Sequence, residues 1–350
     1  MVTTYKPDSS VICDRAAASR RPILTHLNAD TTWLLRLPYG DDSARPPGRS
    51  YFNILIDPWL RGRQSDVAFW FSSQWHVIQS SVETIARLND TLEASESLDD
   101  NSNIHSHTNF VDAVVVSHEF TDHCHKATLL ELDPTVPVFA TNKAAELIRS
   151  WGHFEQVVEP PPFSIQEPDW RKTLHRFLPG WIGISRIVTR DDSLYYHSAI
   201  MIAFDLEPKL LTHSHSGEGS AESVIYTPHG IQAQDLECLN DASPALSTLA
   251  LMHGLHDVRI TTKQLNLGAH NGLQAQRICR AKYWVSTHDE VKKARGFISP
   301  ILFRKKWTLK HALEEERKRI DRGHTQSRAL QVMDKVQFLE LGSGQDVELR

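Results

Sequence analysis

Three histidines and an aspartate, all able to bind metal or carry protons, lie within eight consecutive positions at 118–125. They directly follow the apolar run Val114-Val115-Val116. Apolar, β-branched runs of this kind indicate buried strands, and imidazole and carboxylate groups clustered just past a strand are typical of a metal site. The stretch therefore predicts a metal centre, with His118, Asp122 and His123 as its first candidate ligands.

The same order, an apolar strand next to a histidine, recurs along the chain. Strands that share a sheet can bring such ends to one edge, where loops supply ligands. Taken singly, each histidine is more typical of a hydrogen-bonded structural residue; several together, with Asp122, favour a ligand set. The further histidines are His229 after 224–226, His253 after 249–252, His288 after 283–285 and His197 before 198–204.

Helices recur between the strands that must position these residues. Such an order indicates sheets covered by helices, and no linker divides the chain, so one domain is expected. Strands are predicted at 31–37, 51–56, 114–116, 136–140, 183–188, 198–204, 223–227, 246–252 and 283–286, a final strand and turn at 336–345, and helices at 126–132, 142–151, 231–243, 273–281 and 305–322.

The predicted boundaries follow composition. Residues 1–24 form a flexible N-terminal arm, 25–303 the main domain, and 304–350 a C-terminal helix and strand packed on the same domain. Polar insertions near 88–109 and 212–223 interrupt the domain, and their histidine pairs, 105/107 and 213/215, are interpreted as solvated loop residues. The aromatic stretch 66–76 is either core or a strand, or else an apolar pocket wall.

The composition excludes several classes of function. The 350 residues are 40% hydrophobic and 23% charged, as in globular proteins. A net charge of −5 gives no electrostatic case for nucleic acid or anionic membrane as partner. Four dispersed cysteines without a C-x-x-C pair argue against a disulfide scaffold or a zinc ribbon. With no secretory signal and no apolar run of the ~18–20 residues that span a bilayer, a cytoplasmic protein with a small-molecule substrate is expected.

The segment 117–123 resembles the H-x-H-x-D-H motif of the metallo-β-lactamase superfamily. Other matches follow in the family's order: the opening 56–60 with Asp57 and Trp59, then His197, the turn 226–230, and the end 287–290. The opening and the end most resemble the branch containing N-acyl phosphatidylethanolamine phospholipase D and the ascorbate-6-phosphate lactonases. The resemblance, over roughly 25–300, implies an α/β fold: a four-layer αββα sandwich of two mainly antiparallel or mixed sheets covered by helices.

Two departures from the motif set the expected ligands. Phe120 replaces the second histidine, and His229 stands where the family has an aspartate that bridges two metals. The first metal position keeps only His118 and His197. The second keeps Asp122, His123 and His288, with His229 as a fourth nitrogen. Three or four N/O ligands suffice for zinc, so one ion is expected, with iron or manganese as alternatives.

The resemblance implies a metal-dependent hydrolase acting on an ester, lactone, amide or phosphoester of a small, partly apolar molecule. Asp122 is the expected catalytic residue, either as a ligand or, if not a ligand, by orienting the water or acting as general base. A degenerate, ligand-binding family member and a lyase or isomerase using the same metal are the alternatives. Cys124 is either a thiolate ligand or a small buried residue. Further pocket residues are expected at Asp57, Trp59, Phe120, His125 and His253.

Overall fold

The computed structural model describes residues 20–40, 45–66, 68–99, 109–189, 196–206, 221–321 and 336–350. Most of the predicted arm, and the parts 100–108 and 212–220 of the two predicted insertions, lie outside these residues. The start of the first insertion forms helix α1 (Ile85–Asp99). Ile85, Leu88 and Leu92 give this helix an apolar face at helical spacing, which its overall polar composition obscures.

The first sheet has seven strands and contains the predicted strands 31–37 and 51–56 as antiparallel neighbours. Strand β3 coincides with the predicted 51–56, pairs antiparallel with β2 and runs parallel to β5. The order is β18 (Asp346–Glu348), β1 (Ile23–His26), β2 (Trp33–Pro38), β3 (Tyr51–Ile56), β5 (Ala113–Val116), β6 (Val138–Ala140) and β7 (Val157–Val158).

The second sheet has six strands and is also mixed. Strands β17, β14, β11 and β10 are parallel, whereas β9 and β8 run antiparallel to their neighbours. The order is β17 (Gln337–Leu339), β14 (Tyr283–Val285), β11 (Ser247–His253), β10 (Glu222–Thr227), β9 (Ser198–Phe204) and β8 (Ile182–Val188). Strands β18 and β17, from the C-terminal segment, thus complete one sheet each.

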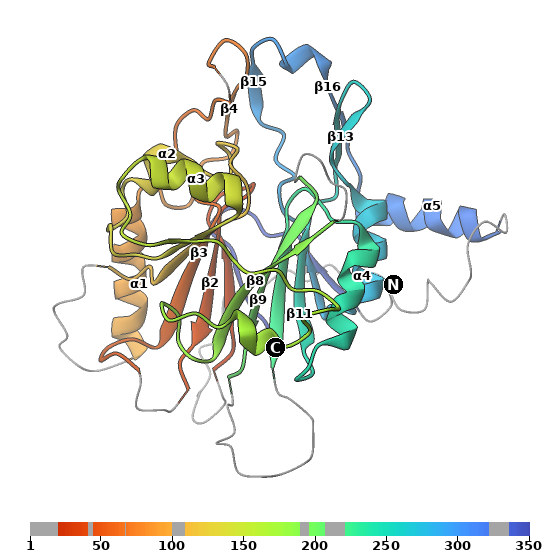
Figure 1. Cartoon of the computed structure of the whole chain (residues 1–350). Helices are drawn as coiled ribbons and strands as arrows, with labels where there is room; N and C mark the ends of the chain where they lie inside the picture. Colours follow the sequence, from red (N-terminus) through yellow and green to blue (C-terminus); the bar gives the residue numbers. More distant parts are fainter. Residues whose placement is uncertain are drawn as a thin grey trace.

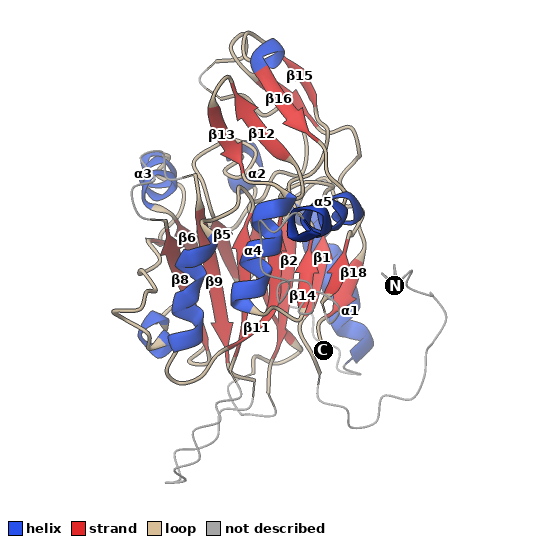
Figure 2. Ribbon diagram, turned by 90° about the vertical axis from the view of Figure 1, so that its right-hand side faces the viewer, coloured by secondary structure: helices blue, strands red, loops and turns tan. Residues whose placement is uncertain are grey.

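Helices cover the outer faces of both sheets, and the inner faces pack on each other (Figures 1 and 2). Strand β5 shows why its run is apolar throughout: Val115 points into the core between the sheets, while Val114 and Val116 pack under the outer helices. The predicted αββα sandwich is confirmed. The helices are α1, α2 (Lys126–Leu129) and α3 (Asn142–Ser150) on the first sheet, and the 3-10 helix η2 (Ala233–Asp241), α4 (Ala269–Cys279) and α5 (Leu309–Asp321) on the second; η1 (Trp170–Thr173) and η3 (Ser299–Ile301) are short 3-10 turns.

Two small sheets rise above one edge of the sandwich (Figure 1). One consists of β13 (Lys263–Asn266), β12 (Asp257–Ile260) and β16 (Leu302–Lys305), and the other pairs β15 (Lys293–Arg295) with β4 (Ser73–Trp75). Strand β4 lies in the stretch 66–76, for which a strand is one of the interpretations; the other four are not predicted, because each is three or four residues long and mostly polar. No helix in the described part of the chain is long and apolar enough to cross a membrane.

Candidate metal centre

The parallel strands of both sheets end at the same edge, below the two small sheets (Figure 1). Asp57 follows β3 and Ser117 follows β5; His229 and His288 lie two and three residues past β10 and β14. His197 reaches this edge from the other direction, because β9 starts where its antiparallel neighbour β10 ends. The fold thus brings His229, His288 and His197 to one edge, whereas His253, which shares the strand-end pattern, is held by other contacts.

Three buried imidazoles form the centre of this cluster. His123, His229 and His288 each offer one nitrogen within 4.8 Å of the other two. The Nε2 atoms of His123 and His229 face each other at 3.1 Å. Two such lone pairs repel unless a proton or a metal ion lies between them. Ligand nitrogens of a tetrahedral zinc, each about 2.0–2.1 Å from the ion, have a comparable separation of about 3.4 Å.

Buried carboxylates fix the orientation of two of these rings. His123 Nδ1 lies 2.6 Å from Asp57 Oδ2, and His288 Nδ1 lies 3.0 Å from Asp30 Oδ1. An ionised carboxylate can only accept, so each Nδ1 donates and each Nε2 lone pair is directed into the cluster. Metal-binding histidines in proteins are held by partners of this kind.

Asp57 lies beneath the centre and does not line the cleft. Besides His123, it accepts hydrogen bonds from the Ser117 backbone N–H at 2.7 Å and from the Tyr226 hydroxyl at 2.7 Å. Burial and this carboxylate raise the pKa of Tyr226 well above its usual value, so the phenol stays a donor. Through these hydrogen bonds, Asp57 connects the end of β5 in the first sheet and Tyr226 of β10 in the second sheet to the ring of His123.

Lys292 places a buried ammonium group beside the imidazoles. Its side chain is 4% exposed, and Nζ lies 2.5 Å from Asp30 Oδ2 and 2.9 Å from Asp122 Oδ2. Burial alone would raise the pKa values of both carboxyl groups, but Lys292 and the neighbouring imidazoles hold them below the usual range. Both carboxylates are therefore ionised. Sequence reasoning missed Lys292 and Asp30.

Asp122 lies at the edge of the triad. Its two oxygens are 3.7 Å from His123 Nε2 and 3.8 Å from His288 Nε2. Asp30, Asp122 and His288 form a second group whose ligand atoms lie within 4.8 Å of one another. Asp122 is thus near enough to contribute an oxygen, although its Oδ2 already accepts from Lys292.

The first metal position is built differently. The ring of His118 stacks on His229 at 4.4 Å, and its buried Nε2 has no hydrogen-bond partner among the described residues. The Phe120 ring lies 6.1 Å from His118 and lines the cleft. Burial, followed by the nearby charges, keeps the pKa of His118 well below its usual value. Burial and the neighbouring imidazoles lower the pKa of His229, and His197 is close enough to add to this effect.

Three other predicted pocket residues have structural contacts outside the triad. His125 bonds to Thr128 Oγ1 at 2.9 Å, and His253 bonds to Gly254 O at 2.7 Å and Asn271 Oδ1 at 2.8 Å. Trp59 is fully buried, and its ring packs against His76 with the ring centres 3.7 Å apart and the planes tilted by 31°. None of the three is among the residues that line the cleft. Cys124 is buried, and burial raises the pKa of its thiol. This environment agrees with the interpretation of Cys124 as a small buried residue.

A cleft of about 330 Å³ opens over the triad. Its floor carries His229, His288, Asp122 and Lys292, and its walls are largely apolar. The walls come from β12, β13, β16, the loop before β4 and the segment between β15 and η3: Phe71, Val258, Ile260, Leu265, Ile298 and Leu302. One part of the predicted aromatic wall is therefore present in Phe71, while Phe69 and Trp70 are exposed.

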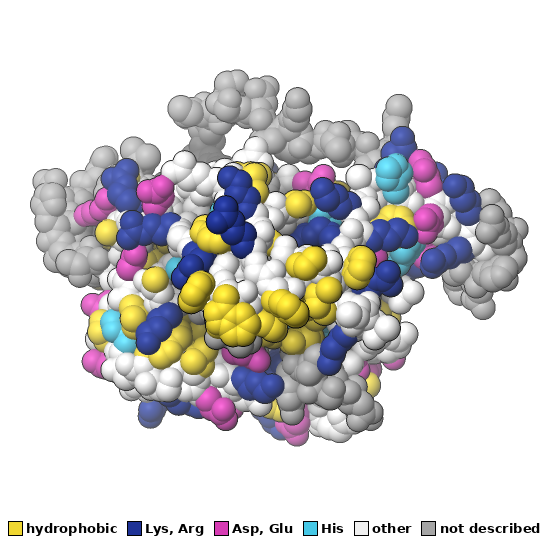
Figure 3. Space-filling view, turned by 90° about the horizontal axis from the view of Figure 1, so that it is seen from above, with side chains coloured by type: hydrophobic (Ala, Val, Ile, Leu, Met, Phe, Trp, Pro, Cys, Tyr) yellow, Lys and Arg dark blue, Asp and Glu magenta, His cyan; other side chains and the backbone are white. Residues whose placement is uncertain are grey.

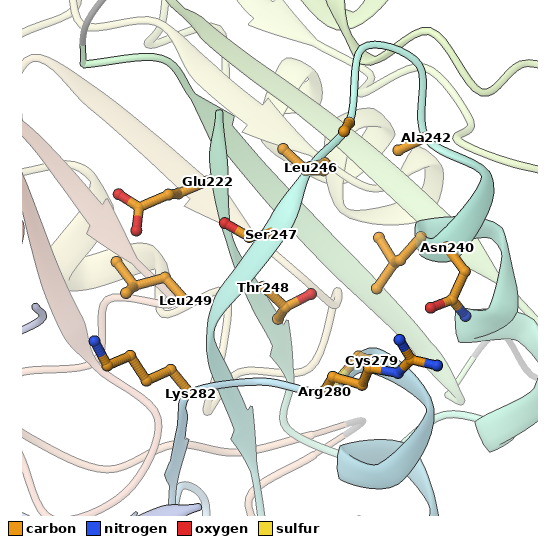
Figure 4. A pocket seen from close by; sticks show the side chains of 12 residues that line it. Glu222, Asn240, Ala242, Leu246, Ser247, Thr248, Leu249, Cys279, Arg280 and Lys282 are labelled. Carbon is orange, nitrogen blue, oxygen red and sulfur yellow. The ribbon is translucent and has the colours of Figure 1, made fainter. Parts of the chain in front are cut away.

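A larger hollow, about 530 Å³, lies at the opposite end of the second sheet, where β10 and β11 begin (Figure 4). Its one carboxylate, Glu222, is paired with Arg21 at 2.8 Å. Neither metal-capable group found among the described residues lies there. Volume alone would select this hollow, but the chemistry lies in the smaller cleft.

The backbone is strained at two residues of the centre. Asp57 and His288 have positive φ angles of 44° and 59°. Non-glycine residues rarely adopt this left-handed region, and the cost is about 1–2 kcal/mol each. In both residues the side chain carries or supports a ligand nitrogen, so the strained backbone coincides with the site.

The residues fit a single metal ion. The facing nitrogens of His123 and His229, and the Nδ1 hydrogen bonds of His123 and His288 to carboxylates, are typical of a ligand set. His123, His229 and His288 would hold the ion, with Asp122 beside it. Lys292 already supplies one positive charge here, and Phe120 offers no lone pair.

Comparisons with known proteins identify relatives of the fold. No family model matches the chain, and no curated protein matches its sequence. The isothiocyanate hydrolase from Delia radicum gut bacteria matches with a TM-score of 0.50 at 15% identity, covering 93% of this chain and 99% of that one. A possible metal-dependent hydrolase from Veillonella parvula matches with 0.52 at 13%, covering 94% and 100%. The diiron β-hydroxylase CmlA from Streptomyces venezuelae matches with 0.51 at 11%, covering 95% and 55%.

At these identities the likeness concerns the fold. The chain has the metallo-β-lactamase fold expected from its motif, which it shares with metal-dependent hydrolases.

Proposed function

We propose that the protein is a metal-dependent hydrolase whose ion is held by His123, His229 and His288. The facing Nε2 atoms of His123 and His229, 3.1 Å apart and buried, support this proposal most directly. Without a cation or proton between them this arrangement is unfavourable. Zinc suits three imidazoles best, and iron or manganese would suit a site that also takes the Asp122 carboxylate.

The bound ion would lower the pKa of its water to about 7 and polarise the bond to be cleaved. The chain's own groups do the positioning. Asp57 and Asp30 keep the ring nitrogens of His123 and His288 facing the cleft. Asp122 is ionised and can accept a hydrogen bond from the attacking water, which orients it. Lys292 fixes the Asp122 carboxylate and can donate from the cleft floor to an oxygen that gains negative charge.

The cleft supports a small, partly apolar substrate. Its volume of about 330 Å³ is at the lower end of small-molecule pockets, and its walls are mostly aliphatic and aromatic. An ester, lactone, amide or phosphoester with an apolar group would place that group against β12 and β16 and its polar bond at the floor. The branch of N-acyl phosphatidylethanolamine phospholipase D and the ascorbate-6-phosphate lactonases remains a prediction from the motifs.

A ligand-binding protein without catalysis is the second candidate. Lys292 supports it, because an ammonium group paired with two carboxylates already supplies positive charge at the centre. Phe120 supports it too, since it removes a nitrogen from the first position.

Metal analysis of the purified full chain separates the two candidates. After dialysis, about one zinc, iron or manganese per chain is expected, together with hydrolysis of a chromogenic ester, lactone or phosphoester. Chelation should abolish the activity, and re-addition should restore it. His229→Ala should lose the metal, whereas His153→Ala, which removes a half-buried histidine outside the cluster, should keep it. Metal at trace level in the wild type would rule out the hydrolase.

A further inference from the structure

Four aromatic side chains project into solvent around the mouth of the cleft. We call Phe69, Trp70, Phe297 and Phe303 the aromatic rim; they are 64%, 61%, 73% and 52% exposed. Viewed from above the cleft edge, hydrophobic side chains gather in a band bordered by lysines and arginines (Figure 3). Single exposed hydrophobics are ordinary, but a group of large aromatics on two neighbouring small sheets marks an interaction site.

The rim is continuous with the interior of the cleft. Phe297 N–H donates to Trp70 O at 3.2 Å, and Ile298 N–H donates to Phe71 O at 3.1 Å, which ties the two loops together. Along each loop an exposed side chain, Trp70 or Phe297, is followed by one that lines the cleft, Phe71 or Ile298. Gly296, with φ +111°, permits this approach, because a Cβ there would lie 2.5 Å from Phe71 O. An apolar path thus leads from the outer surface to the cleft.

Strand β16 repeats this arrangement on the other side of the cleft. Leu302 and Arg304 face the cleft, while Phe303 faces solvent, as strand alternation requires. Arg259, opposite Phe303 in the sheet, places its guanidinium 5.5 Å from the Phe303 ring. The outer face of this strand pair therefore presents an aromatic ring beside a cation.

The charge around the rim is of one sign, although the whole chain carries −5. Segments 68–78, 257–266 and 291–306 contain one carboxylate, Asp257, which is partly buried and accepts from Trp307 Nε1 at 2.6 Å. Every fully exposed charged side chain in these segments is basic: Arg259, Lys263, Lys293, Arg295, Lys305 and Lys306. The net charge of −5 describes the whole chain and does not reflect the basic charge around the rim.

We propose that the aromatic rim docks on anionic lipid bilayers. Tryptophan and phenylalanine at protruding loop tips, surrounded by lysine and arginine, are the usual anchors of proteins that lie on a membrane surface, each basic residue adding attraction to anionic headgroups. A second copy of the chain fits this face poorly, since it would bring the two sets of cations together. If the proposed hydrolase function holds, the amphiphilic substrate would enter the cleft from the bilayer.

The docking is tested by sedimenting the full chain with vesicles. Vesicles of phosphatidylcholine with phosphatidylserine should retain the protein, pure phosphatidylcholine vesicles should retain several-fold less, and high salt should release it. The double variant Trp70→Ser/Phe297→Ser should bind at least tenfold more weakly. Ile165→Ser, which removes a 55% exposed hydrophobic elsewhere, should bind as the wild type does.

Two outcomes would overturn the proposal: no retention of the wild type, or equal retention of the wild type and the double variant. If instead the double variant only abolishes self-association or binding of an acidic protein, the rim serves that partner and the lipid assignment is wrong. The metal content of the double variant should match the wild type. Vesicle binding without any metal would leave the docking intact and remove only the hydrolase.

Discussion

The two halves of the histidine cluster differ in what lies behind each ring. In the second metal position, His123 and His288 each donate to a buried carboxylate and direct a lone pair inward. In the first position, His118 stacks on His229 beside the Phe120 ring, and its Nε2 has no partner among the described residues. The comparison teaches that an outer hydrogen bond to a carboxylate fixes two of the three triad rings, whereas His229, whose Nδ1 has no partner among the described residues, is placed by the end of β10 alone.

Alanine substitutions in the two halves should have very different effects. His123→Ala removes a nitrogen of the triad and should reduce bound metal to trace, whereas His118→Ala should retain most of it. Elemental analysis after dialysis measures the difference. Equal loss in both variants would mean that the ion lies between the two positions.

Removal of the buried ammonium should destabilise the second half. Lys292→Met leaves Asp30 and Asp122 without their cation, and breaking a buried pair costs about 3–5 kcal/mol. Urea unfolding of the metal-free protein measures this loss. Lys293→Met, at the exposed neighbour, serves as the control and should change the free energy of unfolding by less than about 0.5 kcal/mol. An unchanged stability in Lys292→Met would show that the carboxylates do not need the ammonium.

Weakening the outer hydrogen bond should lower metal affinity without removing a ligand. Asp57→Asn tolerates the left-handed backbone but no longer offers a negative oxygen to His123 Nδ1. Changes of this kind typically cost about 10–100-fold in affinity. Competition with a chromophoric chelator gives the value, and an affinity equal to that of the wild type would contradict the role assigned to Asp57.

The smallest expected effect is a gain of bound metal at the first metal position. Phe120→His supplies a third nitrogen beside His118 and His197, so metal content should rise from about one toward two ions per chain. Phe120→Leu is the matched control, since it changes the ring but adds no nitrogen. A content of one ion in both variants would show that the missing nitrogen is not what limits the first position.

The sequence predicted the centre through its strands. Strands β3 and β9 coincide with the predicted 51–56 and 198–204, because their apolar runs are bounded by a proline and by polar residues. Parallel pairing then brings residues after different strands to one edge, so the convergence of His123, His229 and His288 follows from the strand-end pattern. The two departures from the motif, Phe120 and His229, lead to the expectation of one ion at the second position, and this ligand assignment stays a prediction.

The missed features depend on contacts between distant segments. Lys292 lies in a basic stretch, which usually indicates a solvated surface, and only the fold places it between Asp30 and Asp122. The stretch 66–76 was interpreted as core or pocket wall, but Phe69 and Trp70 face solvent, because β4 belongs to a two-stranded ribbon that has no second layer over them. Local pattern cannot distinguish these environments.

The left-handed backbone at Asp57 and His288 is tied to the hydrogen bonds of their side chains. Glycine at position 57 would relax the backbone by about 1–2 kcal/mol, but it would leave the Ser117 N–H, the Tyr226 hydroxyl and His123 Nδ1 without their buried acceptor, and each such loss costs about 1–3 kcal/mol. Selection of heat-resistant variants from a random library would therefore tend to leave these two residues unchanged. The hydrogen bonds that orient the ligands also compensate for the backbone strain.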